Sequence, residues 1–190
     1  MKKIICIGDS ITFGYGVSSD DSWIYLANEK TSHEVINRGV NGDTTGGMLA
    51  RFDRDVLSEK PNQVLIMGGV NDLMMDADLG VIKSNLMAMC HQAIDRQIKP
   101  VVGVTPQMDV DHIHEEWERF TDFLKIQRNL STLREWLIDF GESFEIEVLD
   151  FYGQMPSERE GFSDLFIDGL HLNEKGQVWM ADVFLQFISR

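Results

Sequence analysis

The segment Ile4-Ile5-Cys6-Ile7-Gly8-Asp9-Ser10 lies near the start of the chain and decides the fold. Its apolar residues form a short continuous run, which is typical of a strand buried on both faces of a sheet. The run stops at Gly8, and Asp9 and Ser10 follow at once, so the strand is predicted to end in a polar turn. Open parallel sheets bind their ligands at the carboxyl ends of the strands. The segment therefore predicts a buried strand with a candidate site directly after it.

The rest of the chain repeats this pattern of a short apolar run followed by a longer amphipathic stretch. Further strands are predicted at Glu34–Asn37, Val64–Met67, Val101–Val104 and Glu145–Leu149. Helices are predicted at Ser22–Lys30, Thr45–Leu57, Leu79–Gln97, Glu115–Phe140 and Asn173–Ile188, the last with Asn173 as its N-cap. Strands that alternate with helices build right-handed βαβ units and a parallel sheet covered on both faces. We therefore expect one α/β domain over residues 1–190.

The composition is that of a folded protein with an acidic surface. The 190 residues are 43% hydrophobic and 25% charged, and 31 Asp and Glu against 17 Lys and Arg give a formal net charge of −14. Nucleic acid and anionic membrane surfaces would repel such a chain, so neither is expected as its main partner. No apolar stretch approaches the roughly 20 residues of a membrane span, which predicts no stable membrane insertion.

The cysteines and the N-terminus bear on cellular location. Cys6 lies in an apolar run and Cys90 beside Met89. Two cysteines are too few for a disulfide framework, so both are expected to be reduced, buried thiols. The apolar run after Lys2 and Lys3 is shorter than the roughly 7–15 residues of a signal-peptide core. The expected location is cytoplasmic.

Chemically active side chains follow the predicted strands. Ser10 comes directly after the first strand, and Asp168 and His171 share one segment after the fifth. A serine hydroxyl is a poor nucleophile unless a positioned base takes its proton, and His171 is the candidate base. The spacing lets one turn hold Asp168 against the imidazole Nδ1–H, which leaves Nε2 to face Ser10. These residues predict a Ser-His-Asp catalytic triad.

Acyl transfer also needs hydrogen-bond donors at the oxygen that becomes negative. Candidate donors follow the strands at the same sheet edge: the N–H of Ser10, the N–H of Gly42 and the side-chain amide of Asn71. Glycine at position 42 would let the backbone approach the substrate without a Cβ in the way. These three groups are the predicted oxyanion hole.

Four sequence blocks occur in order after predicted strands: Gly8-Asp9-Ser10-Ile11-Thr12, Gly42-Asp43-Thr44, Gly69-Val70-Asn71-Asp72 and Asp168-Gly169-Leu170-His171. Together they resemble the SGNH (GDSL-type) hydrolase family. The resemblance implies a three-layer α/β/α flavodoxin-like fold, here with a five-stranded parallel sheet, and a serine esterase or acylhydrolase that needs no cofactor. It implies Ser10 as nucleophile, with Asp168 and His171 completing the triad and Ser10, Gly42 and Asn71 forming the oxyanion hole. Leu172 departs from the family pattern, in which Pro often follows the histidine.

The resemblance leaves the substrate open. A small-molecule carboxylic ester, an acetylated sugar, a lysophospholipid and a thioester all fit this chemistry. The net charge weakly disfavours a highly anionic leaving group, although Arg38 and Arg51 could supply a local basic patch. A catalytically silent binding module on the same fold is a function of another class, which the full set of catalytic groups disfavours. A nucleotide- or flavin-binding protein would lack its phosphate motifs here. The sequence specifies no oligomeric state.

The stretch after the fourth strand, Asp109-Val110-Asp111-His112-Ile113-His114-Glu115-Glu116, mixes carboxylates with imidazoles. Such groups can bind metal, but their spacing matches neither an EF-hand nor a His-Glu-x-x-His site. We therefore expect no metal and a solvated acidic lid. Met108, Ile113 and Trp117 lie in or beside this stretch, where they would contact an acyl chain or pack beneath the loop. The sequence favours the two roles equally.

Overall fold

The computed structural model describes residues 1–157 and 160–190, with the backbone alone of Glu116 and Glu118. Its strands are β1 (Lys3–Gly8), β2 (Glu34–Gly39), β3 (Gln63–Met67), β4 (Lys99–Val104) and β5 (Glu147–Asp150). They form one five-stranded sheet in the order β2-β1-β3-β4-β5, and each neighbouring pair is parallel. This order is that of a flavodoxin-like doubly wound fold, which confirms the predicted fold class.

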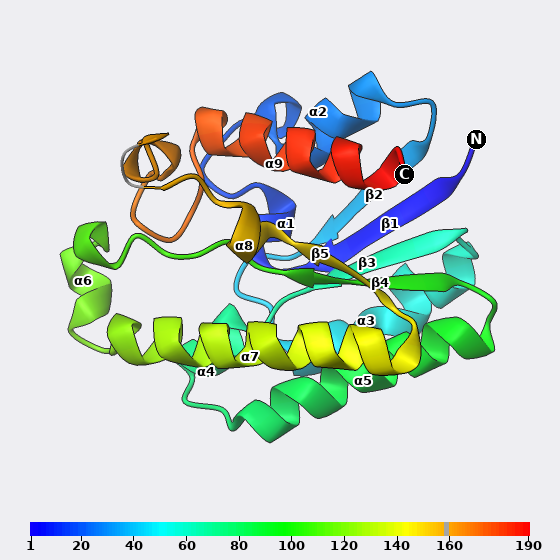
Figure 1. Cartoon of the computed structure of the whole chain (residues 1–190), viewed down its shortest axis with the longest axis horizontal. Helices are drawn as coiled ribbons and strands as arrows, with labels where there is room; N and C mark the ends of the chain where they lie inside the picture. Colours follow the sequence, from blue (N-terminus) through cyan, green and yellow to red (C-terminus); the bar gives the residue numbers. More distant parts are fainter. Residues whose placement is uncertain (158–159) are drawn as a thin grey trace.

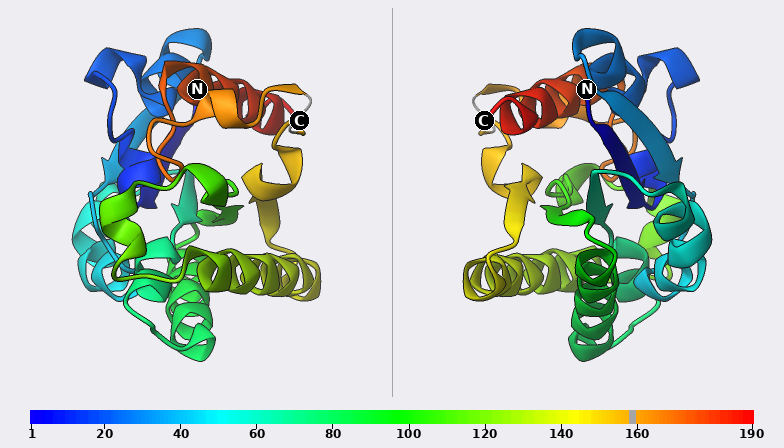
Figure 2. Two further views of the ribbon diagram at one scale, coloured as in Figure 1. Left: turned by 90° about the vertical axis from the view of Figure 1, so that its left-hand side faces the viewer. Right: turned by 90° about the vertical axis from the view of Figure 1, so that its right-hand side faces the viewer.

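Helices cover both faces of the sheet. The α-helices are α1 (Ser10–Phe13), α2 (Trp23–Lys30), α3 (Thr45–Asp55), α4 (Val70–Met74), α5 (Leu79–Asp95), α6 (Glu115–Glu118), α7 (Phe123–Phe144), α8 (Phe151–Gln154) and α9 (Glu174–Ile188). Short 3₁₀ turns are η1 (Ser19–Asp21), η2 (Leu57–Glu59), η3 (Val110–His112) and η5 (Ser163–Leu165). Figure 1 shows α2 and α9 on one side of the sheet and α3, α5 and α7 on the other. The result is three layers, as the views along the sheet also show (Figure 2).

The core lies between these layers. The strands β1 and β3 are almost wholly buried along their length, because helices pack on both of their faces. Large side chains fill the space between α2, α9 and the sheet, with the Trp23 ring edge-on to Phe151 and Phe184. Each such side chain contributes roughly 1.5–3 kcal/mol through burial. This rigid frame holds the ends of the strands in fixed positions.

The strand order places the polar strand ends together. β1 is flanked by β2 on one side and β3 on the other, so the connection after β1 runs to one side of the sheet and the connection after β3 runs to the other. Open α/β sheets bind ligands in the crevice that forms at such a switch point. Ser10 follows β1, and Asn71 lies just beyond β3, on opposite sides of this crevice.

The predicted helix at Glu115–Phe140 is wrong as a single element. The chain forms α6, leaves the helix after Glu118, and starts α7 at Phe123. Asp122 ends the irregular stretch, because its side chain accepts a hydrogen bond from the N–H of Lys125 at 2.9 Å and caps α7. Phe120, an apolar residue inside the predicted helix, lies in this break and is 88% exposed. The apolar pattern continues across the break, whereas the Asp122 cap starts a separate helix.

Both cysteines are buried free thiols, as predicted. Burial raises the pKa of the Cys6 thiol far above its ordinary value and that of Cys90 to about 12. Within the described residues, no helix is long and apolar enough to cross a membrane.

Candidate active site

Ser10 stands at the junction of β1 and α1, where the backbone is tightly packed. A Cβ on Gly8 would collide with Thr12 and with the backbone of β3, so glycine is required where α1 turns over the end of β1. Asp9 caps α1 by accepting a hydrogen bond from the N–H of Ile11 at 2.9 Å. This turn holds Ser10, which is nearly buried, at the carboxyl edge of the sheet.

The structure brings together the three residues of the predicted triad. The distance from His171 Nε2 to Ser10 Oγ is 3.0 Å, and that from His171 Nδ1 to Asp168 Oδ2 is 2.8 Å. The other carboxylate oxygen, Oδ1, accepts hydrogen bonds from the backbone N–H of His171 at 2.7 Å and of Leu170 at 3.0 Å. An ionised carboxylate can only accept, so Nδ1 carries the proton and Nε2 faces Ser10 as an acceptor. This is the geometry that a general base needs.

The surroundings of Asp168 keep its carboxyl group ionised. Burial raises the pKa of Asp168, but hydrogen bonds from the side chain and backbone of His171 and from Leu170 outweigh burial and bring the pKa below its ordinary value. A carboxylate anion at Nδ1 stabilises the imidazolium that forms when Nε2 takes a proton. The pair is therefore suited to receive a proton from Ser10.

The candidate oxyanion residues lie on two neighbouring loops at the same edge. Gly42 has φ +74°, and an added Cβ would meet no atom within 4 Å, so its backbone borders open space. Asn71 lies on α4 and donates from Nδ2 to the carbonyl of Asp43 at 2.9 Å. Because an amide nitrogen carries two hydrogens, the second remains to be donated elsewhere. The bond holds the Asn71 side chain against the loop that carries Gly42.

Arg51 stabilises the loop that carries Gly42. Its guanidinium contacts Asp43 at 2.7 Å and Asp55 at 3.0 Å, and it also donates to the carbonyls of Arg38 and Gly8. Its side chain is only 10% exposed. Arg51 thus joins the ends of β1 and β2 to the loop and is engaged by two carboxylates. Its charge is neutralised inside the molecule, so it does not form the basic patch considered from the sequence.

Aromatic rings border the imidazole of His171. The Tyr15 ring lies 4.5 Å from the His171 ring, and the Trp117 ring lies 5.6 Å away in an edge-on arrangement. Met108 and Ile113, the other two residues singled out in the stretch after β4, are buried in the hydrophobic core. Of the three, it is Trp117 that contacts the His171 ring.

Asp9 is a further carboxyl group close to the triad. It is fully buried, and its Oδ2 has no hydrogen-bond partner in the described part of the chain. Burial raises the pKa of Asp9 from 3.8 to about 6, against the opposing effects of the Ile11 N–H and of His171. Ionisation of the Asp9 carboxyl group in the folded protein is therefore unfavourable.

The acidic stretch after β4 contains a second carboxylate–imidazole pair. His112 Nδ1 lies 2.9 Å from Asp109 Oδ2, the Asp109 side chain is buried, and that of His112 is exposed. The described residues contain no group of three or more His, Cys, Asp or Glu side chains placed to hold a metal ion. The turn packs directly against the triad loop, because a Cβ on Gly169 would collide with the backbone of Asp109, His112 and Ile113.

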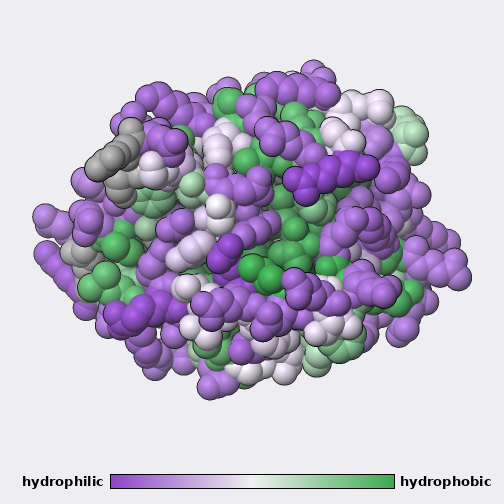
Figure 3. Space-filling view, in the orientation of Figure 1, coloured by the Kyte–Doolittle hydropathy of each residue, from purple (hydrophilic) through white to green (hydrophobic). Residues whose placement is uncertain are grey.

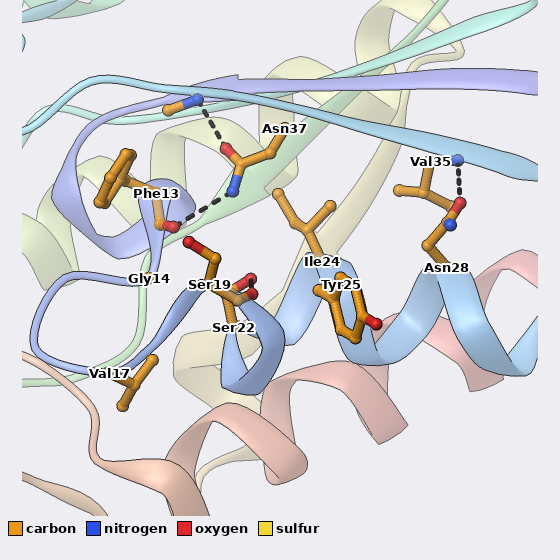
Figure 4. A pocket seen from close by; sticks show the side chains of 11 residues that line it. Phe13, Gly14, Val17, Ser19, Ser22, Ile24, Tyr25, Asn28, Val35 and Asn37 are labelled. Atoms are coloured by element: carbon orange, nitrogen blue, oxygen red, sulfur yellow. Dashed lines mark hydrogen bonds between the residues drawn. The ribbon is translucent and has the colours of Figure 1, made fainter.

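A cavity of about 340 Å³ lies behind α1, between α2 and the edge strand β2 (Figure 4). Its lining includes Phe13, Val17 and Tyr25, but none of the three triad residues. Asn28 and Asn37 accept hydrogen bonds from the N–H groups of Val35 and Gly39, which covers part of the edge of β2. This cavity is separate from the candidate active site.

The sequence did not predict the contact between Tyr15 and His171, or that Arg51 holds the loop of Gly42 in place. Tyr15 lies in an irregular loop, so no periodicity could show which way its ring points. Arg51 sits on a predicted amphipathic helix, where a lone arginine is typical of a solvated face. Two acidic residues near it in the sequence, Asp43 and Asp55, were the one available signal for its ion pairs.

Comparison with known proteins gives a consistent result. The model of the GDSL-like Lipase/Acylhydrolase family matches residues 6–179. An arylesterase from Vibrio mimicus is 28% identical over 192 residues, which covers 97% of this chain and 87% of that protein. An acetylxylan esterase from Geobacillus stearothermophilus is 41% identical over 98 residues, covering 43% of this chain and 45% of that protein.

A solved structure extends the similarity to the whole fold. The lipase/acylhydrolase from Enterococcus faecalis superposes with a TM-score of 0.80 at 26% sequence identity. The match covers 99% of this chain and 95% of that chain. Helices, sheet and strand ends are thus shared over nearly the full length.

Proposed function

The chain belongs to the GDSL-like lipase/acylhydrolase family and is a carboxylic ester hydrolase, and from this premise we propose that it works through a Ser10–His171–Asp168 triad. The observation that carries the proposal is the continuous chain of contacts from Ser10 Oγ to Nε2 and from Nδ1 to Asp168. A nucleophile, a base and an orienting carboxylate in hydrogen-bond reach of each other are the parts that acyl transfer needs.

The reaction proceeds in two halves. Ser10 Oγ attacks the acyl carbonyl carbon while His171 Nε2 takes the hydroxyl proton, and the carbonyl oxygen becomes negative. The N–H groups of Ser10 and Gly42 and the Asn71 amide donate to that oxygen. His171 then gives its proton to the departing alcohol, which leaves an acyl group on Ser10. Water attacks this acyl-enzyme while His171 takes a proton from it. The bond to Ser10 Oγ then breaks, His171 returns the proton to Oγ, and the carboxylic acid leaves.

The acyl group of the substrate is proposed to be short. An arylesterase and an acetylxylan esterase are among the relatives, and the second of these acts on an acetyl ester. Gly42 borders open space, so the oxyanion side of the site is accessible to small esters. Acetate and butyrate esters are therefore the substrates to try first.

Ser10→Ala tests the proposal with p-nitrophenyl acetate. We expect turnover to fall by roughly 10⁵-fold or more, and labelling by a fluorophosphonate probe to disappear. Ser22→Ala is the matched control, because Ser22 is also a buried serine and its hydroxyl donates to the carbonyl of Ser19, away from the triad. Thermal unfolding of both variants reports folding. Unchanged turnover in a folded Ser10→Ala protein would exclude Ser10 as the nucleophile.

A further inference from the structure

Proton transfer determines on which side of the site the leaving group must lie. In the proposed function, on which this inference rests, His171 Nε2 donates the proton to the leaving oxygen, so that oxygen must come within hydrogen-bond reach of Nε2. The acyl oxygen is directed to Gly42 and Asn71 instead. The alcohol part of the substrate therefore extends along the His171 side of the site.

Two aromatic rings from different segments of the chain border the His171 imidazole. Tyr15 follows α1, and its ring centroid is 4.5 Å from that of His171 with the planes at 48°. Trp117 lies on α6, with its ring 5.6 Å from His171 and at 79° to it. Tyr15 is 45% exposed and Trp117 is half-buried, so both keep accessible ring surface beside the His171 imidazole.

Both rings are held in place before a substrate arrives. The backbone N–H of Tyr15 donates to the carbonyl of Ser10 at 3.0 Å, which ties this loop to the nucleophile. The next residue, Gly16, has φ +92°, and a Cβ there would collide with the side chain of Ile167. Trp117 packs against the hydrophobic core. Binding a ligand to preformed aromatic surface costs little ordering entropy.

The charges around this side do not suit an anionic leaving group. Arg51 is buried and paired with Asp43 and Asp55. Lys125, at the start of α7, is paired with Asp76 at 2.6 Å. The net charge of −14 adds to the bias against an anionic group. Figure 3 shows a mostly hydrophilic face, with hydrophobic residues among the hydrophilic ones at the end that carries α6.

We infer that Tyr15 and Trp117 form a ring-binding subsite for the leaving alcohol. Aromatic rings bind the apolar face of another ring by stacking or edge-on contact. Esters whose alcohol carries such a face, an aryl alcohol or a pyranose sugar, are therefore preferred over esters of small acyclic alcohols with the same acyl group. The subsite determines the preference for the alcohol part of the ester, whereas the preference for the acyl group depends on the Gly42 side of the site.

The test compares three acetyl esters that differ only in the alcohol: phenyl acetate, an O-acetylated methyl pyranoside and 2,2,2-trifluoroethyl acetate. The readout is the ratio of kcat/KM for each ring ester to kcat/KM for the trifluoroethyl ester, whose alcohol is activated but has no ring. We expect Tyr15→Ala and Trp117→Ala each to lower this ratio roughly tenfold for the ring that the subsite binds. Loss for one ring ester alone identifies which ring is preferred.

Two further variants separate binding from other effects. Tyr15→Phe keeps the ring and should retain the wild-type ratio. Tyr25→Ala is the matched control, because Tyr25 is 42% exposed but lines the separate cavity behind α1. Its ratio should equal that of the wild type.

Equal loss on all three esters would overturn the inference, since it would mean that the rings only position His171. Unchanged ratios in both alanine variants would overturn it as well. Failure of the proposed function has a different signature, because Ser10→Ala would then retain turnover whatever the ratios show.

Discussion

Two turns of this molecule carry the same Asp-x-x-His arrangement and pack against each other. In the triad loop, Asp168 Oδ2 lies 2.8 Å from His171 Nδ1, and in the turn after β4, Asp109 Oδ2 lies 2.9 Å from His112 Nδ1. The backbone N–H of Asp109 donates to the carbonyl of Gly169 at 2.8 Å, so the turns are in direct contact. They differ in their exposure, since 9% of the His171 side chain is accessible to solvent against 68% of that of His112.

The two pairs differ in their surroundings. Nε2 of His171 meets the hydroxyl of Ser10 in a nearly buried site, where electrostatic interactions act with little screening. The His112 ring is mostly in contact with solvent, which weakens its interaction with Asp109. A carboxylate–imidazole pair is therefore not by itself a catalytic site. It becomes a candidate catalytic device only where the fold brings a nucleophile to it and excludes water.

Replacing the two histidines gives the largest contrast. His171→Ala removes the proposed base, so kcat/KM for p-nitrophenyl acetate should fall by about 10⁵-fold or more. His112→Ala should stay within about twofold of the wild type, because its exposed ring does not contact Ser10. Initial rates of both purified variants measure the difference. Comparable losses would show that the two pairs act together.

The two aspartates provide a second contrast of the same kind. Asp168→Asn should lower kcat by about 10⁴-fold, because the amide no longer stabilises the imidazolium or the required tautomer. Asp109→Asn keeps an acceptor oxygen for His112 and should leave kcat within about threefold. A pH–rate profile and a thermal melt of each variant separate catalysis from folding. A large loss in kcat for a well-folded Asp109→Asn protein would contradict the assigned difference.

The contact between the turns can be disrupted at Gly169. Its φ is +81°, and a Cβ would collide with the backbone of the turn after β4, so Gly169→Ala should lower the free energy of unfolding by about 2–4 kcal/mol. Asp168 and His171 flank this position, and activity should fall roughly 10–100-fold. Gly161→Ala is the control, because Gly161 has φ +89° but only ordinary contacts.

Gly161→Ala should cost about 1–2 kcal/mol through its backbone conformation alone and keep full activity. Denaturant unfolding and initial rates measure both quantities. If the two glycine variants lose stability and activity equally, the packing between the turns is unimportant.

The ionisation of Asp9 allows a test by pH beside the triad, because the charge of Asp9 interacts with His171. Its pKa is raised from 3.8 to about 6, so the folded protein holds this proton more tightly than the unfolded chain does. Stability should therefore fall as pH rises from about 4 to 6, and the loss is complete above that range. Asp9→Asn removes the ionisation and keeps an oxygen for the Ile11 N–H.

The stability of Asp9→Asn relative to the wild type should rise between pH 4 and pH 7 by up to about 3 kcal/mol. Urea unfolding at a series of pH values measures this. Asp20→Asn is a suitable control, since Asp20 is an exposed carboxylate in η1. A difference from the wild type that does not change with pH would show that Asp9 titrates normally.

Much of the frame could be predicted from local sequence. The apolar runs predicted all five strands, and the predicted ends lie within two residues of those in the structure. The short helices α1, α4 and α8 were missed because four or five residues show no periodicity. The break between α6 and α7 was missed because the capping role of Asp122 does not interrupt the apolar pattern. Local signals thus predicted the long elements and failed at short ones.

The candidate site divides in the same way. The sequence by itself determined which chemical groups follow which strands, because strand ends and turns depend on neighbouring residues. Only the tertiary structure decided that His171 is buried against Ser10 across 161 positions of sequence while the His112 side chain stays 68% exposed. It also decided that Tyr15 and Trp117 border the imidazole. The physical reason is that burial and long-range contacts follow from how the layers pack, and identical Asp-x-x-His spacings carry no information about that packing.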